Sequence, residues 1–511
     1  MFRLNGIVRL LLLPIGYARA AALHQPHIRA EGLQWGPCEL TTETDIPVEC
    51  TKLAVPRDYV DRNSNETIDL DIIRVKAIQQ PSKGSILLNF GGPGQDGLNN
   101  MVAYYPLQGP IIGEQHDLIS WNPRGTGNTL RFQCYSDEVE NSAAAAGLAG
   151  TLVSSSDTAL GKVWAEAKVI ADNCYSQQNA TGGLVGMAYV ARDMMQIVDA
   201  LDEDGMLRYW GISGGTALGS TVAAMFPDRI DKVILDGVMN VHQYYNSYEP
   251  ESLAGADGAF EHFLSACLEN RDTCALARNF TNVDELTAAM DKLFDTLRNE
   301  PIPVWQLLAA VDYTIVKTTI LSELYRPPSW PQLAVALNGL IDRNATDFVL
   351  QYLVSDAPTI PREAEAILGI RCGDKGVRAS DQSEMVPVLD EFFKSSKWFG
   401  DFAFGWYSAV CAQWPMAARE RYTGDFNVQT ANPILFIGNP FDPITAFKSA
   451  QNMSSSFEGS VLLQHNGFGH TSLADSSNCT NAYIKSYFEE GTLPEPGSVC
   501  EPNYALFQLP Q

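Results

Sequence analysis

The sequence predicts an α/β protein, in which a mostly parallel sheet is flanked by helices and carries a large helical insertion. Short apolar segments alternate with helical segments through residues 85–240, and the same alternation returns after residue 426. Residues 241–425, between these two parts, contain mainly helical patterns. The third observation is a sharp, glycine-rich turn at Gly211–Gly215, between a strand pattern and a helix pattern. The chain has 511 residues, a length that suits one elaborated domain or two smaller ones.

The turn at Gly211–Gly215 has the pattern G-x-S-x-G, with Ser213 at its centre. Leu207–Trp210 predicts the end of a strand, and the small, apolar Thr216–Met225 predicts a buried helix. A strand, a sharp turn and a helix form a nucleophile elbow, in which flanking glycines allow a strained backbone. The N-terminus of the helix favours the negative charge that forms during acyl transfer. We therefore predict that Ser213 is a nucleophile, the alternative being an ordinary tight turn.

Two later strands end close to residues that would complete a serine mechanism. Pro433–Gly438 predicts a buried strand, which is followed by Asp442, and Ser460–Gln464 predicts the next strand, which is followed by His470. The order Ser213, Asp442, His470 is that of the α/β hydrolases. A serine is a weak nucleophile unless a histidine takes its proton, and a carboxylate then orients and stabilises the imidazole ring.

Each of these two roles has an alternative candidate. His465 also lies near the last predicted strand, and Asp236 follows the predicted strand at residues 233–235. We favour His470 because it lies on a Gly-x-Gly-His loop after its strand, and Asp442 because its Asp-Pro turn lies where most such acids lie. The sequence contains no H-E-x-x-H motif and no histidine pair spaced for chelation, so we predict neither a metal nor another cofactor.

A second glycine-rich turn predicts an oxyanion hole. Ser85–Phe90 has the pattern of a buried strand and runs into Gly91 and Gly92. The alternative is a turn needed for packing alone. Because an elbow lies downstream, we predict that the amides of Gly91 or Gly92, with that of Gly214, hold the oxyanion. Arg124 lies in another turn after a strand, and we interpret it as a structural clamp, since the serine mechanism gives it no role.

The first twenty residues have the pattern of a secretory signal peptide. Arg3 and Arg9 give a basic start, Leu10–Leu13 begins a short apolar segment, and Ala18-Arg-Ala20 offers a cleavage site. Loss of residues 1–20 removes three arginines and no acid, which moves the formal net charge from −25 to −28. We expect a secreted, soluble protein without a nucleic-acid or membrane partner. Such an acidic chain is repelled by nucleic acid and by anionic lipid.

Cysteines and glycosylation sequons fit this secreted interpretation. Ten cysteines, an even number, suit an oxidising compartment. Their spacing suggests the local pairs Cys38–Cys50, Cys134–Cys174, Cys267–Cys274, Cys372–Cys411 and Cys479–Cys500, although some free buried thiols are the alternative. The candidate glycosylation sites are Asn65, Asn179, Asn279, Asn344, Asn452 and Asn478.

The remaining patterns complete the domain organisation. Residues 52–56 and 68–75 predict two antiparallel strands, Met187–Leu201 predicts a helix with one apolar face, and Asn141–Asp157 predicts a surface insertion. The predicted units are a signal peptide (1–20), a first core part (21–240), a mainly helical cap (241–425) and a second core part (426–511). The helices expected in the cap span residues 257–268, 282–298, 313–324, 331–342 and 383–394.

Taken together, the motifs resemble a family over nearly all of the mature chain. They are Val55-Pro-Arg-Asp-Tyr59, Gly91-Gly-Pro-Gly94, Trp121-Asn-Pro-Arg-Gly-Thr-Gly127, Tyr209-Trp-Gly-Ile-Ser-Gly-Gly-Thr216, Cys411 with Trp414-Pro415, Asp442-Pro-Ile-Thr445 and Gly469-His470. The chain is similar to secreted tripeptidyl aminopeptidase-like α/β hydrolases, which are related to the prolyl aminopeptidases. The resemblance implies a serine exopeptidase that cleaves short peptides near a free N-terminus, with a cap that restricts access.

Several positions depart from the family pattern, and they concern the substrate pocket. Gly214 stands where relatives usually carry an aromatic residue, Gln95-Asp96 replaces the more usual Gly-Ser, and Ala446 replaces a frequent proline. A carboxylate such as Asp96, or one on the cap, is a candidate for binding a substrate ammonium. The alternative function is a secreted esterase, lactonase or thioesterase for a small molecule, because fold and triad do not decide between amide and ester. A catalytically inactive binding module is disfavoured because all three triad positions are filled.

Overall fold

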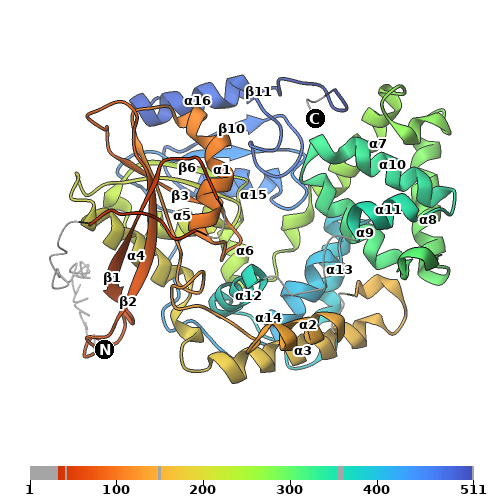
Figure 1. The fold of residues 1–511 in the computed structure, drawn as a ribbon, viewed down its shortest axis with the longest axis horizontal. Helices are drawn as coiled ribbons and strands as arrows, with labels where there is room; N and C mark the ends of the chain where they lie inside the picture. Colours follow the sequence, from red (N-terminus) through yellow and green to blue (C-terminus); the bar gives the residue numbers. More distant parts are fainter. Residues whose placement is uncertain (1–32, 41–42, 148–150, 354–361, 509–511) are drawn as a thin grey trace, which may run out of the picture.

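A computed structural model describes residues 33–508, apart from 41–42, 148–150 and 354–361, so the predicted signal peptide lies outside the described residues (Figure 1). Within them, nine strands form one sheet in the order β1-β2-β4-β3-β5-β6-β9-β10-β11. The strands are β1 (Val48–Pro56), β2 (Thr67–Val75), β3 (Ser85–Asn89), β4 (Asp117–Trp121), β5 (Leu207–Ile212), β6 (Ile230–Asp236), β9 (Leu435–Gly438), β10 (Val461–His465) and β11 (Val499–Cys500).

The sheet is antiparallel at one edge and parallel elsewhere. Strand β2 pairs antiparallel with both β1 and β4, which confirms the predicted hairpin, and the other strand pairs are parallel. In the register, Asn89 lies opposite Gly211, and Asp236 lies opposite both Ile212 and Ile437. The central strands therefore end at one level, and the loops that follow them meet over the same edge of the sheet.

Helices cover both faces of the sheet because its strands alternate their apolar side chains between two cores. On β3, Ile86 and Leu88 pack in one core and Leu87 packs in the other. Helices α1 and α16 cover the first face, and α4 and α5 cover the second. The helices of this core are α1 (Gly97–Ile112), α4 (Met187–Ala200), α5 (Gly214–Met225), α15 (Phe447–Ser456) and α16 (Asn478–Glu490). The predicted fold class, a mostly parallel α/β sheet with a helical cap, is confirmed.

The cap forms a helical block beside the sheet (Figure 1). Its elements within residues 241–425 are α6 (Val241–Asn246), α7 (Ala256–Glu269), α8 (Val283–Asn299), α9 (Tyr313–Leu324), α10 (Trp330–Ile341), α11 (Thr346–Tyr352), α12 (Arg362–Asp374), α13 (Val386–Ser395), α14 (Ala409–Ala412) and a hairpin of β7 (Ile302–Val304) and β8 (Ala309–Val311). All five predicted cap helices are present, with small shifts at their ends. Asn282 caps α8 by accepting a hydrogen bond from the Glu285 amide at 2.9 Å.

The predicted surface insertion at Asn141–Asp157 is wrong for the residues that the structure describes. The alanine-rich sequence forms helix α2 (Glu138–Gly147), consistent with the high helix propensity of alanine. Beyond it, Leu152 is buried, and Ser154 donates from its amide and its hydroxyl to Asp401 of the cap at 3.0 and 2.5 Å. Helix α3 (Ala159–Gln178) also packs on α14. The cap therefore recruits residues before 241, which the sequence patterns assigned to the core.

Buried charge and disulfides tie the fold together. Arg124 forms a fully buried ion pair with Asp193, at 2.6 and 2.7 Å, and donates to the carbonyl of Pro56 at 3.0 Å, which confirms its role as a clamp. The ten cysteines form the five suggested pairs, Cys38–Cys50, Cys134–Cys174, Cys267–Cys274, Cys372–Cys411 and Cys479–Cys500. In the described part of the chain, none of the helices has the length and apolar character needed to cross a membrane.

Candidate active site

Ser213 lies on a strained turn between β5 and α5. Its φ of 53° and ψ of −121° are a conformation that residues other than glycine rarely adopt. The turn needs its glycines, because a Cβ on Gly211 would lie 2.5 Å from the Gly215 carbonyl oxygen, and one on Gly215 would lie 2.7 Å from Asn89 Oδ1. The predicted elbow is therefore present in its geometry, and it raises Ser213 above the edge of the sheet.

The loop after β3 packs directly against this elbow. A Cβ on Gly91 would lie 2.9 Å from Ser213 Cβ, and one on Gly214 would lie 2.8 Å from the Gly92 nitrogen. The Gly91 amide already donates to Asn89 Oδ1 at 3.1 Å. Of the three predicted oxyanion donors, Gly92 and Gly214 remain available as candidates, and Gly91 is already engaged by a side chain.

His470 and Asp442 meet over the ends of β9 and β10. His470 Nδ1 lies 2.9 Å from one oxygen of the Asp442 carboxylate and 3.1 Å from the other. Asp442 is fully buried and also accepts hydrogen bonds from the amides of Ile444, Thr445 and Thr471 and, at 2.7 Å, from the Thr445 hydroxyl. Burial alone would raise the pKa of Asp442, but the His470 charge and these hydrogen bonds outweigh it and lower that pKa. With Nδ1 occupied, Nε2 is the ring nitrogen left to take a proton.

The two alternative residues have other partners. His465 is fully buried and pairs with the Thr480 hydroxyl at 2.9 Å, and burial lowers its pKa to about 4. Asp236 accepts hydrogen bonds from the amide and hydroxyl of Ser472, at 2.9 and 2.6 Å, and burial raises its pKa to about 6. Asp236 thus anchors the loop that carries His470 without contacting the imidazole. The geometry favours Asp442 and His470 for the acid and base positions.

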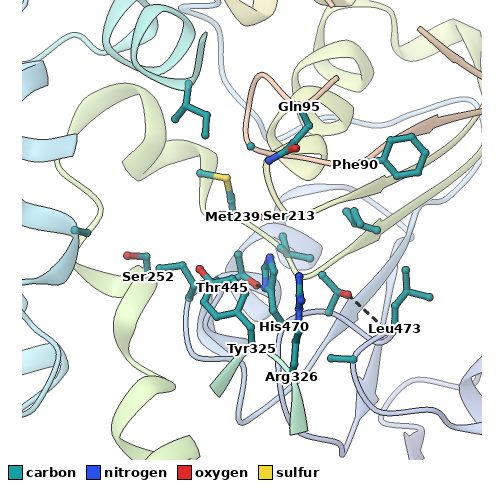
Figure 2. A pocket seen from close by; sticks show the side chains of 18 of the residues that line it. Phe90, Gln95, Ser213, Met239, Ser252, Tyr325, Arg326, Thr445, His470 and Leu473 are labelled. Atoms are coloured by element: carbon teal, nitrogen blue, oxygen red, sulfur yellow. Dashed lines mark hydrogen bonds between the residues drawn. The ribbon is translucent and has the colours of Figure 1, made fainter. Parts of the chain in front are cut away.

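A cavity of about 1090 Å³ lies above these residues, between the edge of the sheet and the cap. Ser213, His470 and Tyr325 all face it (Figure 2). The Tyr325 ring contacts the His470 ring with centroids 4.9 Å apart, and the Tyr325 carbonyl accepts a hydrogen bond from the His470 amide at 3.0 Å. The cap therefore helps to fix the loop of the candidate base, a role that no sequence motif indicated for Tyr325.

The candidate ammonium-binding role of Asp96 is wrong. Its carboxylate caps α1, where it accepts hydrogen bonds from the amides of Leu98 and Asn99 at 2.9 and 3.0 Å and from the Asn99 side chain at 2.8 Å. It does not line the main cavity, and Gln95 does. Asp96 follows a turn and precedes a helix, which is the ordinary place for an N-cap, so capping chemistry explains this residue fully.

The six candidate glycosylation sites share one property in the structure, which is that each asparagine is exposed. They are Asn65, Asn179, Asn279, Asn344, Asn452 and Asn478. Asn478 begins α16 and accepts a hydrogen bond from the Asn503 side chain at 3.2 Å, and its neighbour Cys479 is disulfide-bonded. Exposure makes all six chemically reachable, and Asn478 is the most constrained of them.

The fold and the elbow define the class of the protein. A mostly parallel sheet that carries a strained serine turn after β5, with a cap inserted between β6 and β9, is the architecture of an α/β hydrolase. In agreement, residues 397–500 match the family model described as TAP-like protein.

Proteins similar to this chain carry both peptidase and esterase names. Serine protease Hip1 of Mycobacterium tuberculosis is 26% identical over 98% of this chain and 99% of its own length. Carboxylesterase B of the same species is 26% identical over 92% of this chain and 90% of its own. Tripeptidyl aminopeptidase of Streptomyces lividans is 22% identical over 95% of this chain and 90% of its own length. The predicted resemblance to tripeptidyl aminopeptidase-like α/β hydrolases is confirmed, and these relatives support a serine hydrolase.

Proposed function

We propose that the protein is a secreted serine exopeptidase, an aminopeptidase that cleaves short peptides near a free N-terminus with Ser213, His470 and Asp442 as its triad. The observation that carries the proposal is the buried Asp442 carboxylate bound at 2.9 Å to Nδ1 of His470, a residue that lines the same cavity as Ser213. Such a carboxylate fixes the imidazole tautomer and stabilises the imidazolium ion.

In the proposed reaction, Ser213 Oγ attacks the substrate carbonyl carbon while His470 Nε2 takes its proton. The amides of Gly92 and Gly214 stabilise the negative oxygen of the tetrahedral intermediate, helped by the N-terminus of α5. His470 then gives the proton to the leaving nitrogen, the C–N bond breaks, and the acyl group remains on Ser213. A water molecule then attacks the carbonyl carbon of the acyl-enzyme while His470 takes its proton. The bond to Ser213 Oγ breaks, His470 returns the proton to that oxygen, and the acid is released.

An exopeptidase fits the shape of the cavity. The cap lies over the triad, so the cavity suits the end of a short chain better than the middle of a folded one. Two similar proteins are named as a serine protease and a tripeptidyl aminopeptidase. Secretion is proposed from the signal-peptide pattern, the five disulfides and the exposed sequons.

The second candidate is an ester, lactone or thioester hydrolase that uses the same triad. It is supported by the relative named carboxylesterase B. It is also supported by the state of Glu249, the one acid among the described cavity residues, which is engaged by Arg371 at 2.6 Å and Lys375 at 2.7 Å. An aminopeptidase normally needs a charge partner for the substrate ammonium, and an engaged carboxylate is a poor one.

One assay separates these functions. It compares a free-amine tripeptide anilide, its N-acetylated form and a short-chain ester, with the mature protein and with Ser213→Ala. We expect cleavage of the free-amine peptide, weak cleavage of the acetylated one, and loss of at least about 10⁴-fold in kcat for the variant without loss of folding. Ester cleavage with both peptides intact would replace the peptidase proposal by the esterase. Full activity of Ser213→Ala would contradict the triad.

A further inference from the structure

The ionisable side chains of the cap wall give the cavity a positive character. Among the described residues that line it, the cations from the cap are Arg326 and Arg371, and Glu249 is the one acid. The chain as a whole has a formal net charge of −25. Because the protein as a whole is acidic, the positive charge at the cavity is a local feature. It favours a substrate that carries a negative charge.

Glu249 is not free to bind an ammonium. It is 4% exposed, and its carboxylate contacts Arg371 Nη2 at 2.6 Å and Lys375 Nζ at 2.7 Å. Burial would raise the pKa of Glu249, but the two cations outweigh it and hold the pKa below its ordinary value. Two cations share one carboxylate in this cluster, so Glu249 is a poor partner for a substrate ammonium.

Arg326, in contrast, has no anionic partner within the part of the chain that the structure describes. It follows Tyr325, whose ring and carbonyl contact His470, so the backbone places it at the candidate base. The Arg326 residue is exposed, and it lines the cavity together with Tyr325 and His470 (Figure 2). An exposed guanidinium in a substrate cavity presents paired N–H donors that match a carboxylate.

We propose that Arg326 binds a carboxylate on the leaving group of the substrate, such as the α-carboxylate of a short peptide's departing residue. This inference rests on the proposed triad. His470 delivers its proton to the leaving atom, and in an amino-acid leaving group the carboxylate lies two bonds from that nitrogen. As the C–N bond breaks, the amine takes the proton from His470, the acyl group stays on Ser213, and Arg326 holds the departing carboxylate. The substrate class is therefore short peptides, or esters, that end in an acid beside the scissile bond.

The test uses matched substrate pairs that differ only in the leaving-group carboxylate. One pair is tetraalanine and tetraalanine amide, in which release of a tripeptide leaves alanine or its amide. The other pair is O-acetyl-lactate and O-acetyl-lactamide, in which the carboxylate or amide carbon lies two bonds from the leaving oxygen. The proteins are the wild type, Arg326→Gln, Arg326→Lys and the control Arg278→Gln, which alters an exposed cap arginine outside the cavity lining. The readout is the acid-to-amide ratio of kcat/KM, with the melting temperature of each variant measured as a check on folding.

We expect the wild type and Arg278→Gln to prefer the acid by about tenfold or more, which corresponds to 1.4 kcal/mol. Arg326→Gln should bring the ratio near one, and Arg326→Lys should keep part of it, because lysine retains charge without the paired donors. A wild-type ratio near one, or an unchanged ratio in Arg326→Gln, would overturn the proposal.

Further measurements distinguish a failure of this proposal from a failure of the proposed function or triad on which it rests. para-Nitrophenyl hemisuccinate carries its carboxylate on the acyl side, so a dependence on Arg326 for this ester, with no effect on the leaving-group pairs, would overturn the placement. If neither peptide is cleaved but the ester pair still shows the Arg326-dependent ratio, the exopeptidase proposal fails and the carboxylate proposal stands. If Ser213→Ala keeps its activity, the triad itself is wrong.

Discussion

The sheet side and the cap side of the cavity are built on different principles. On the sheet side, Ser213, Asp442 and His470 each follow a strand, and the common level of the strand ends brings them together. On the cap side, Glu249 and Arg371 come from segments far apart in the chain and are held by mutual charge. The first side is set by the backbone of the fold, whereas the second depends on a few side chains.

This difference suggests that the sheet side determines the reaction and the cap side determines which substrate is preferred. Loops at the ends of parallel strands are common to many hydrolases, so the sheet side can be expected to perform the same acyl transfer whatever the substrate. Glu249, Arg326 and Arg371 of the cap line the cavity and are not part of the sheet. Substitutions on the sheet side should therefore lower kcat, and substitutions on the cap side should alter substrate preference or the stability of the cap.

After Ser213→Ala, the largest effect is expected for Asp442→Asn. The amide cannot stabilise the imidazolium and favours the wrong imidazole tautomer, so kcat should fall by about 10⁴-fold. The matched control is Asp475→Asn, which alters another buried acid on the loop of His470 that does not contact the ring. Steady-state kinetics on any cleaved substrate gives the comparison. A loss smaller than about tenfold in Asp442→Asn would assign the acid role to another residue.

On the cap side, Glu249→Gln should destabilise the protein by about 3 to 5 kcal/mol, since it leaves Arg371 and Lys375 buried without their anion. Chemical denaturation measures the change in unfolding free energy. The control Glu261→Gln removes an exposed acid of the same block and should change it by less than about 0.5 kcal/mol. Equal stability of the two variants would show that the buried cluster is unimportant for the cap.

Asp236 lies on the sheet side, at the end of β6, and should give a pH-dependent difference. Its pKa in the folded protein, about 6, exceeds the ordinary value of 3.8, so the folded state favours the protonated acid. Relative to Asp236→Asn, the wild type should lose stability as pH rises from about 4 to 6, by up to about 3 kcal/mol. Unfolding free energies of both proteins across this range test the sign. A difference that is constant, or that moves the other way, would mean that Asp236 is ionised when folded.

The smallest effect is expected for Thr445→Val. Its hydroxyl donates to Asp442 at 2.7 Å, and the carboxylate keeps three backbone donors without it. We expect about a tenfold loss in kcat, with the acid limb of the pH–rate profile moved to higher pH, because the Asp442 anion loses one stabilising hydrogen bond. Thr445→Ser should restore the wild-type profile. If Thr445→Val leaves the pH–rate profile unchanged, the Thr445 hydroxyl does not stabilise the Asp442 anion and Thr445 contributes only to packing.

The sequence predicted the sheet side well because its signals are local. A strand, a glycine turn and a small-residue helix occupy consecutive positions around Ser213, and Asp442 and His470 each follow a recognisable strand. The cysteine pairs were also local in sequence, and the structure forms all five. Asp96 was misread because a carboxylate near a catalytic loop resembles a ligand site, whereas its position before α1 made it a helix cap.

The cap side could not be predicted from one sequence in the same way. Tyr325 reaches His470 across a long stretch of chain, and neither its position nor that of Arg326 follows from a periodic pattern. The segment at residues 141–157 was likewise misjudged, since Ser154 within it bonds to Asp401 in the distant cap. Contacts of this kind arise from tertiary packing, which local propensity does not encode.

The contact between Tyr325 and His470 also bears on the order in which the enzyme matures. Ser213 is synthesised well before the cap, and His470 follows the cap along the chain. Because the Tyr325 carbonyl accepts a hydrogen bond from the His470 amide, docking of the cap adds a contact that helps to position the candidate base. A chain synthesised only as far as the cap therefore lacks the candidate base, and a complete chain with an undocked cap lacks one of the contacts that hold this base.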